Sequence, residues 1–325
     1  MKLNVDAHFW CLGGFAERYV PGGYYDDMSV DEKLEIMSKI EGFTGLTTFY
    51  PTAPLPSDPE KLMKKLADYG LKVSFLVPES WSDRKWKYGA FSTSEANIRR
   101  EAIDFFKEGI DFARAVNAES VLLWPAHDGF DSVFQTDYRD GWKYLVDTVR
   151  EIGEYDTSMK IAIEYKSKDP RQKQYVNNVG KTMMLLNDVG LDNVGGVIDT
   201  GHSLMAQESL AESLVILDSH NKLFQIHLND NYKDSDPDLI LGTVNFWEIL
   251  EFFYYLNKTD YEGWSAVDII SARDDRGKSL ELAIRLTWKY KELADKLTGH
   301  SEEIDNNLKG CRFVDNMNLI MDIVF

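Results

Sequence analysis

The sequence predicts an α/β protein: a single closed (β/α)8 barrel of the TIM type, followed by a C-terminal extension. Short apolar runs rich in β-branched and aromatic residues alternate with longer amphipathic stretches along most of the chain. Parallel strands need a crossover segment, usually a helix, between them. Eight such units fit a closed barrel better than an open sheet. We therefore expect a barrel domain over residues 1–297 and an extension over 298–325.

The expected elements follow one another in strict alternation. The expected strands are 3–10, 46–50, 71–77, 120–124, 160–165, 194–199, 223–228 and 265–269. The expected helices are 29–41, 58–69, 94–116, 138–154, 174–190, 207–220, 245–257 and 276–297. Serine N-cap candidates precede the first three helices at Ser29, Ser57 and Ser94. The tail ends in the apolar run Leu319–Phe325, so we expect it to pack on the barrel or on a neighbouring subunit.

The composition excludes several classes of protein. Lys and Arg number 36 against 54 Asp and Glu, and the net charge of −18 argues against a nucleic-acid partner, whose phosphates require basic contacts. No apolar run approaches the ~20 residues of a membrane-spanning helix, so we expect no membrane partner. Cys11 and Cys311 cannot form a disulfide framework, and the early acid Asp6 is untypical of a signal peptide. A cytoplasmic protein is the expectation.

Groups able to bind a metal stand at the ends of the last four expected strands. They are Glu164, Asp199, His227 and Asp268. Active sites of (β/α)8 barrels lie at the C-terminal ends of the strands, so these groups should converge there. Three carboxylates and one imidazole suit Mn²⁺, Mg²⁺ or Co²⁺. A single carboxylate at a strand end could equally cap a loop or a helix, but that explanation is poor for four in succession.

A second set of possible ligands lies beside the first. His202 follows Asp199 by three residues, and the loop after the seventh expected strand carries Asp234, Asp236 and Asp238. These groups could hold a second cation, with Asp199 bridging the two ions. The alternative is a solvated acidic loop.

Other residues are candidates for contact with a substrate. Lys166 lies two residues after Glu164, so an extended strand places both on one face, where Lys166 either contacts a substrate oxygen or pairs with Glu164. His127 is a candidate substrate contact, and His8 is either a core residue or part of the site. Aromatic residues near strand ends form either core or an apolar wall for a substrate: Trp10, Phe49, Trp81, Trp124 and Phe130.

Several segments resemble those of xylose isomerase-like sugar isomerases. Glu164–Arg171, which reads Glu-Tyr-Lys-Ser-Lys-Asp-Pro-Arg, resembles the Glu-x-Lys-x-x-Glu-Pro-Arg segment of xylose isomerases. Three further parts of the sequence resemble metal ligands of xylose isomerase and, more closely, of L-rhamnose isomerase: Asp199–His202, the Asp236/Asp238 pair and Asp268. In L-rhamnose isomerase the bridging ligand is an Asp, as Asp199 is here. Leu123–Phe130 is similar to the Trp-containing loop after strand 4 of both.

The resemblance implies a divalent-metal aldose–ketose isomerase that moves a hydride between C1 and C2 of a sugar. It implies a structural cation bound by Glu164, Asp199, His227 and Asp268. It implies a catalytic cation bound by His202, Asp236 and Asp238, with Asp199 again. The catalytic residues would be Lys166, which steadies a substrate oxygen, with Glu164, Asp199, His202 and Asp236. We expect two ions per chain, Mn²⁺ ahead of Mg²⁺ or Co²⁺, and a homo-oligomer, either a dimer or a tetramer.

One departure from the family pattern keeps alternatives open. Xylose isomerases carry a histidine near the end of strand 2 that helps to open the sugar ring, and Thr47–Pro51 has none. A ketose 3-epimerase with one metal and two carboxylates is the main alternative, although the Asp236/Asp238 pair favours the isomerase. The net charge disfavours a nuclease resembling endonuclease IV, and the full ligand set disfavours a non-catalytic sugar-binding protein.

Overall fold

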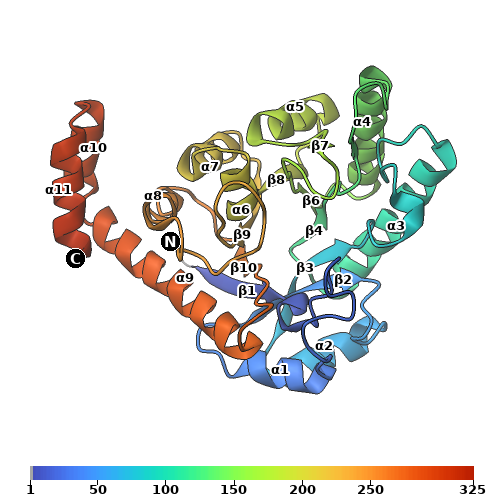
Figure 1. The fold of residues 1–325 in the computed structure, drawn as a ribbon, viewed down its shortest axis with the longest axis horizontal. Helices are drawn as coiled ribbons and strands as arrows, with labels where there is room; N and C mark the ends of the chain where they lie inside the picture. Colours follow the sequence, from blue (N-terminus) through green and yellow to red (C-terminus); the bar gives the residue numbers. More distant parts are fainter. Residues whose placement is uncertain (1–2) are drawn as a thin grey trace.

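A computed structural model describes residues 3–325, which form the expected closed barrel with its helices outside (Figure 1). The strands follow the order β1-β10-β9-β8-β6-β4-β3-β2, and neighbouring barrel strands are parallel. The barrel strands are β1 Asn4–His8, β2 Gly45–Tyr50, β3 Lys72–Pro78, β4 Ser120–Leu123, β6 Lys160–Ile163, β8 Val194–Asp199, β9 Leu223–Leu228 and β10 Trp264–Val267. The sequence prediction of a (β/α)8 barrel is confirmed.

Amphipathic helices surround the sheet and bury their apolar faces against it. They are α1 Val30–Ser38, α2 Pro59–Ala67, α3 Ala96–Ala115, α4 Tyr138–Tyr155, α5 Val179–Val189, α6 Thr200–Met205, α7 Leu210–Ser219, α8 Phe246–Leu256 and α9 Arg276–Thr298. Short 3-10 helices, η1 Phe9–Leu12 and η2 Arg84–Trp86, lie after β1 and β3. The main core fills the layer between sheet and helices, and a smaller apolar cluster lies in the barrel interior.

Local capping explains where the observed helices differ from the expected ones. Ser29 caps α1 in a reciprocal pair with Glu32, as its sequence position predicts. The N-cap of α2 is Asp58 rather than Ser57, because the Asp58 carboxylate accepts the Lys61 N–H at 2.9 Å. The third prediction is also wrong, since the N-cap position of α3 is Glu95 and not Ser94.

Two short elements were not expected from the sequence. The helix expected over 174–190 begins only at Val179, because Asn178 caps it and the preceding residues form a strand, β7 (Lys173–Gln174). This strand pairs antiparallel with β5 (Gly129–Phe130), and the pair links the loops that follow β4 and β6. The turn α6 directly follows β8, because the Asp199 side chain accepts the N–H of His202. Both differences bear on the site.

The C-terminal extension consists of α10 (Ser301–Lys309) and α11 (Phe313–Val324), which follow the long helix α9 at the edge of the molecule (Figure 1). Ile304 is buried, and the ring of Phe325 stacks on Phe246 of α8 with centroids 5.9 Å apart. The extension therefore packs on the outer helices of its own chain. Phe313 remains exposed.

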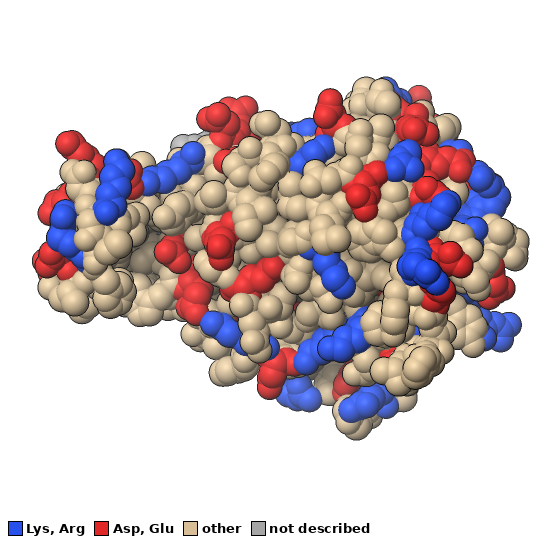
Figure 2. Space-filling view, turned by 90° about the horizontal axis from the view of Figure 1, so that it is seen from above, with Lys and Arg blue, Asp and Glu red and all other residues tan. Residues whose placement is uncertain are grey.

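The surface bears a mixture of charges. On the face in Figure 2, Lys and Arg side chains are scattered among Asp and Glu. Within residues 3–325, no helix combines the length and apolar character that crossing a bilayer requires.

Candidate metal centre and active site

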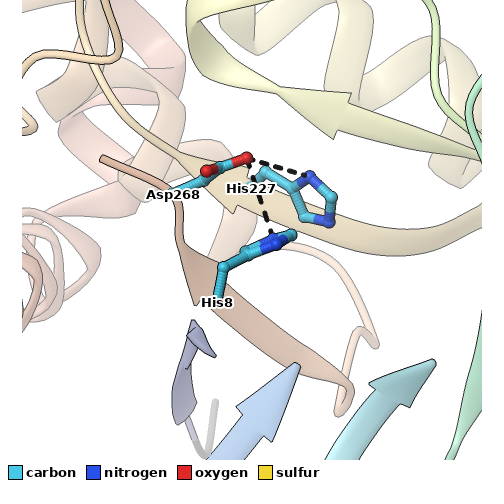
Figure 3. A group of neighbouring side chains, drawn as sticks. All are labelled: His8, His227 and Asp268. Atoms are coloured by element: carbon cyan, nitrogen blue, oxygen red, sulfur yellow. Dashed lines mark ion pairs between the residues drawn. The ribbon is translucent and has the colours of Figure 1, made fainter. Parts of the chain in front are cut away.

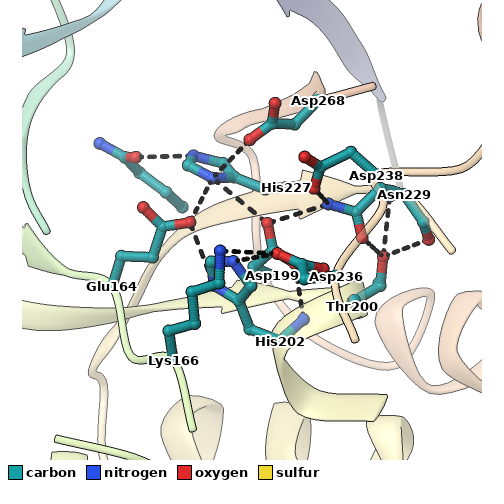
Figure 4. A network of polar contacts seen from close by, with 12 residues as sticks. Glu164, Lys166, Asp199, Thr200, His202, His227, Asn229, Asp236, Asp238 and Asp268 are labelled. Atoms are coloured by element: carbon teal, nitrogen blue, oxygen red, sulfur yellow. Dashed lines mark hydrogen bonds and ion pairs between the residues drawn. The ribbon is translucent and has the colours of Figure 1, made fainter. Parts of the chain in front are cut away.

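The four ligand candidates at the ends of the last four barrel strands meet at one point (Figure 4). They are Glu164, Asp199, His227 and Asp268, all buried, with candidate ligand atoms within 4.8 Å of one another. They come from β6, β8, β9 and β10 or the residue just after, and these strands are consecutive in the barrel. The convergence predicted from the sequence is therefore observed.

Strand register and capping set the orientation of Asp199. Asp199 ends β8 and is the register partner of His227 on β9, so their side chains emerge at the same level. One carboxylate oxygen accepts the backbone N–H of His202 at 2.9 Å. The other accepts the amide N–H of Asn229 at 3.2 Å. These contacts hold the Asp199 carboxylate rigidly between the two predicted ligand sets.

The ring of His227 is aimed at the carboxylates through Nδ1. This atom lies 3.1 Å from Glu164 Oε1, 3.8 Å from Asp199 Oδ2 and 4.0 Å from Asp268 Oδ2. An imidazole nitrogen facing three carboxylate oxygens is a donor arrangement suited to a divalent cation.

His8 also lies in this region, next to two of the candidate ligands. Its Nε2 lies 3.7 Å from Asp268 Oδ2, and its ring meets His227 edge to face at 4.9 Å (Figure 3). A further group of three possible ligands, with ligand-forming atoms within 4.8 Å of one another, consists of His8, His227 and Asp268. The Asp268 carboxylate thus faces two imidazoles, and its Oδ1 accepts the indole N–H of Trp10 at 2.9 Å.

The electrostatics of the group reflect crowded, buried carboxylates. Burial, reinforced by Asp199 and Glu164, raises the pKa of Asp268 to about 7. Burial also raises the pKa of Asp199. Burial opposes the charged form of His227, yet Glu164 and its neighbours raise the pKa of that imidazole to about 9. The group therefore favours any positive charge placed among the carboxylates.

The second predicted ligand set lies directly beside the first. His202 Nε2 lies 3.0 Å from Asp236 Oδ2, and its Nδ1 lies 3.5 Å from Glu164 Oε1. Asp238 is buried and receives the Asn229 amide at 3.5 Å. Burial and the neighbouring Asp236 raise the pKa of Asp238 well above its usual range.

Asp234 takes no part in this set. Its side chain is exposed and accepts the hydroxyl of Ser235. The inclusion of Asp234 among the possible ligands was therefore wrong, since the loop turns this residue toward solvent.

Lys166 pairs with the second set rather than with Glu164. Its Nζ lies 2.9 Å from Asp236 Oδ2 and 3.6 Å from Asp169 Oδ2, over the ring of Trp124 at 5.4 Å. Burial favours the neutral amine, yet Asp236 and Asp238 raise the pKa of Lys166 well above its usual range. The alternative of a simple Glu164–Lys166 ion pair is not what the geometry shows.

The predicted aromatic residues form a continuous row along one side of the site. Trp10, Phe49, Trp81 and Trp124 meet edge to face at centroid distances of 6.0, 5.8 and 5.0 Å. The row begins at the Trp10–Asp268 hydrogen bond and ends under Lys166. It is an apolar boundary of the kind that keeps water from a reacting centre.

Two other predicted contacts lie differently. Phe130 packs on Tyr138 and Tyr175 at 5.0 and 6.1 Å, which places it in the β5–β7 region and outside the row. The half-buried ring of His127 lies 3.0 Å from the carbonyl of Trp81 through Nε2. His127 therefore fixes the loop that carries Trp81.

A cleft of about 860 Å³ opens beside the second ligand set. Asp236 and Asp169 line its inner part, and the loops after β1 and β10 form its outer rim with Tyr24 and Arg273. A volume of this size is typical of a small-molecule site.

The residues present fit divalent cations. Among the charged groups gathered here, one lysine faces five buried carboxylates: Glu164, Asp199, Asp236, Asp238 and Asp268. His202 Nδ1 is buried and makes no hydrogen bond in the described residues. Buried carboxyl groups this close together are stable only when they are protonated, paired with a positive charge or coordinated to a metal. The first group, Glu164, Asp199, His227 and Asp268, could hold one ion.

Sequence reasoning missed two supporting residues. Asn229 lies two residues after His227, so strand alternation could have placed it on the same face, where it binds Asp199 and Asp238. Gln225 lies two residues before His227 and contacts the far side of its ring. An amide has no metal-ligand signal by residue type, so neither attracted attention.

Comparison with known proteins identifies the family of the chain. A family model described as "Xylose isomerase-like TIM barrel" matches residues 35–288. The chain belongs to this family. Among its relatives are the xylose isomerases of Listeria welshimeri serovar 6b, 23% identical over 259 residues, and Thermus thermophilus, 24% identical over 209 residues. These alignments cover 77% and 62% of this chain and 56% and 54% of those enzymes, so the chain spans about half the length of these curated relatives.

Solved structures of the xylose isomerase-like fold superpose well on the chain. A structure of L-ribulose 3-epimerase has a TM-score of 0.74 at 15% identity and covers 92% of this chain and 98% of its own. D-psicose 3-epimerase from Clostridium cellulolyticum H10, solved with D-tagatose, has a TM-score of 0.66 at 14% identity. The match covers 89% of this chain and 99% of the epimerase chain. A structure of IOLI protein with a zinc atom has a TM-score of 0.66 at 17% identity and covers 89% and 98%. At these identities the likeness shows the shared fold.

Proposed function

We propose that this member of the xylose isomerase-like family is a divalent-metal sugar isomerase that interconverts an aldose and a ketose. The observation that carries the proposal is the second ligand set, in which His202, Asp236 and Asp238 lie beside the first four ligands with Lys166 among them. Bound divalent cations would supply Lewis-acid polarisation of the substrate carbonyl and a template for two neighbouring oxygens.

The protein side chains have separate tasks in this proposal. Lys166 brings a buried ammonium next to Asp236 and Asp169, which line the cleft, and there it can stabilise negative charge developing on a substrate oxygen. Asp236 Oδ2 pairs with Lys166 Nζ and with His202 Nε2, and so keeps both groups oriented before substrate enters. Asp199, between the two sets, holds them in fixed relation.

The aromatic row suits a hydride shift. Transfer of hydrogen between C1 and C2 requires the two carbons to stay aligned and shielded from water. Trp10, Phe49, Trp81 and Trp124 present a continuous apolar side that would exclude water there. An apolar wall would also contact the C–H faces of a sugar.

A ketose 3-epimerase is the second candidate, and one observation favours it. Glu164 and Asp268 approach His227 Nδ1 from different strands at 3.1 and 4.0 Å, so two carboxylates flank a single potential cation site. A pair of this kind could remove and return a proton at one carbon. The relatives include xylose isomerases, and the superposed structures include 3-epimerases, so both chemistries occur on this fold.

Metal stoichiometry after reconstitution with Mn²⁺ tests the proposal. The wild type and the double variant Asp236→Asn/Asp238→Asn are compared by elemental analysis. We expect two ions per chain in the wild type and one in the variant. One ion in both proteins would favour the epimerase, and no retained ion in the wild type would refute both.

Isotope exchange provides the chemical test. An aldose deuterated at C2 is incubated with the Mn²⁺-loaded protein in ordinary water, using a panel of pentoses, hexoses and deoxyhexoses. A hydride shift retains deuterium in the ketose, whereas proton exchange through an enediolate loses it to solvent. Loss of the label would overturn the isomerase mechanism.

A further inference from the structure

Gln225 is a buried polar side chain in the barrel interior, close to a small apolar cluster. It lies on β9 two residues before His227, with both side chains on the inner face, and it is fully buried. The neighbouring interior cluster contains Val77, Leu122 and Ala162. A leucine or methionine would fill such a position without the cost of burying an amide.

Both ends of the Gln225 amide are hydrogen-bonded. The amide oxygen, Oε1, lies 3.2 Å from His227 Nε2. The amide nitrogen donates to the hydroxyl of Ser120 on β4, across the barrel, at 2.7 Å. Ser120 and His227 are themselves fully buried. The three side chains therefore form a fully buried hydrogen-bonded chain from β4 to the candidate ligand group.

The two nitrogens of the His227 ring determine which atoms of this chain donate and which accept hydrogen bonds. Nδ1 faces Glu164, Asp199 and Asp268, so a cation held there would require its lone pair. The ring proton then belongs on Nε2, which needs an acceptor, and the Gln225 oxygen is the atom in contact with it. Donation to Ser120 keeps the amide from turning its NH₂ group toward the ring.

We propose that Gln225 is a positioning residue that holds His227 with Nδ1 aimed at the first cation. The inference rests on the metal site of the proposed function. The acceptor that supports a metal-bound histidine is commonly a carboxylate, a backbone carbonyl or water, and here a side-chain amide anchored to Ser120 takes that place.

The test measures Mn²⁺ affinity directly, by titration of the chelator-stripped protein with the electron paramagnetic resonance signal of free Mn²⁺ as readout. In Gln225→Leu, the acceptor is lost with little change in volume, and we expect Mn²⁺ to bind about 10- to 100-fold more weakly. Gln225→Glu restores an acceptor oxygen, whether the carboxyl group is charged or neutral. We expect its affinity to lie within about threefold of the wild type or to exceed it.

A matched variant separates positioning from loss of stability. Asn193 precedes β8 at the opposite end of the barrel, where its amide donates to the carbonyls of Gly153, Asp156 and Met159 at 3.0, 3.2 and 3.0 Å. Asn193→Leu removes an amide of the same type and should lower the melting temperature while leaving Mn²⁺ affinity unchanged.

The outcomes distinguish this inference from the proposed function. If the wild type binds Mn²⁺ and Gln225→Leu binds it equally well, the positioning role is wrong and the metal site stands. Equal weakening in Gln225→Leu and Gln225→Glu would also overturn it, because the acceptor would then be irrelevant. Absence of Mn²⁺ binding in the wild type would remove both the inference and the metal site.

Discussion

Gly201, the second residue of α6, touches the second ligand set so closely that one added methyl group should disturb it. A Cβ built at this position would overlap Asn229 Oδ1 and lie only 2.8 Å from Asp236 Oδ1 and 3.0 Å from Asn231 Nδ2. Asn231 in turn binds the Gly201 carbonyl and Asp236 at 2.8 and 3.3 Å. Gly201→Ala should therefore push Asp236 away from its present place.

The size of the effect follows from these distances. Ordinary contact for a Cβ begins at 3.4 Å, so Asp236 must move by about 0.6 Å and Asn229 by more. Such overpacking costs about 1–3 kcal/mol, partly offset by about 0.5–1 kcal/mol for replacing glycine in a helix. We expect the free energy of unfolding to fall by about 1–2 kcal/mol. Displacing a group that orients Lys166 should lower kcat/KM by about 10- to 100-fold.

Gly180→Ala is the matched control for this experiment. Gly180 is also the second residue of its helix, α5, but it is exposed, and a Cβ there would meet only Asn178 Oδ1 at 3.4 Å. We expect its stability to be unchanged or slightly raised and its activity to be that of the wild type. Urea unfolding and steady-state kinetics with the sugar identified in the panel would be measured for both variants. Wild-type stability and turnover in Gly201→Ala would refute the assigned packing around Asp236.

Two further outcomes are expected. Removal of metal with a chelator should lower the melting temperature by about 5 °C or more, because an ion present at 100 times its Kd stabilises the folded protein by about 2.7 kcal/mol. Addition of Mn²⁺ should restore the original melting temperature. An unchanged melting temperature after chelation would contradict metal binding. Hydrogen bonds from Arg100, assisted by Lys107, lower the pKa of Glu151 from 4.5 to about 2. Because the pKa of Glu151 is lower in the folded state than in the unfolded state, its ion pairs stabilise the fold at pH values above the unfolded-state pKa. We expect wild type to exceed Glu151→Gln in free energy of unfolding by about 0.5 kcal/mol at this half-exposed site. The difference should be fully present at pH 7 and should shrink below pH 4.5. A difference that grows on acidification in urea unfolding would refute this.

The fold was predictable because hydrophobic periodicity is a local signal. The strand expected over 194–199 is β8 as observed, and the strand expected over 223–228 is β9. The β5–β7 pair was not predictable, because each strand has only two residues and depends on pairing between two loops. The start of α5 was likewise misplaced, since Asn178 gives a capping signal that the preceding apolar residues obscured.

The part of the candidate site that could be predicted consists of acidic and histidine side chains at strand ends, because their residue type alone indicates a possible metal ligand. Asp199 and His227 fall in register as the alternation implied. Their supports were not predictable, because Gln225 and Asn229 matter only through contacts with side chains on other strands. The partner of Lys166 could not be predicted either. Asp236 comes from a loop 70 residues away, and hydrophobic periodicity gives no information about the path of a loop.

The pairing of β1 with β10 has a consequence for the growing chain on the ribosome. Trp10 and its partner Asp268 are separated by 258 residues, and the strands beneath them close the barrel. At about 5–20 residues per second, the early strand waits about 13–50 s before its neighbour has been made. Throughout that interval one edge of β1 has no partner, and an unpaired strand edge is a template for association. The candidate ligand group of Glu164, Asp199, His227 and Asp268 is complete only after Asp268 has been synthesised, so the four side chains cannot act together before that point.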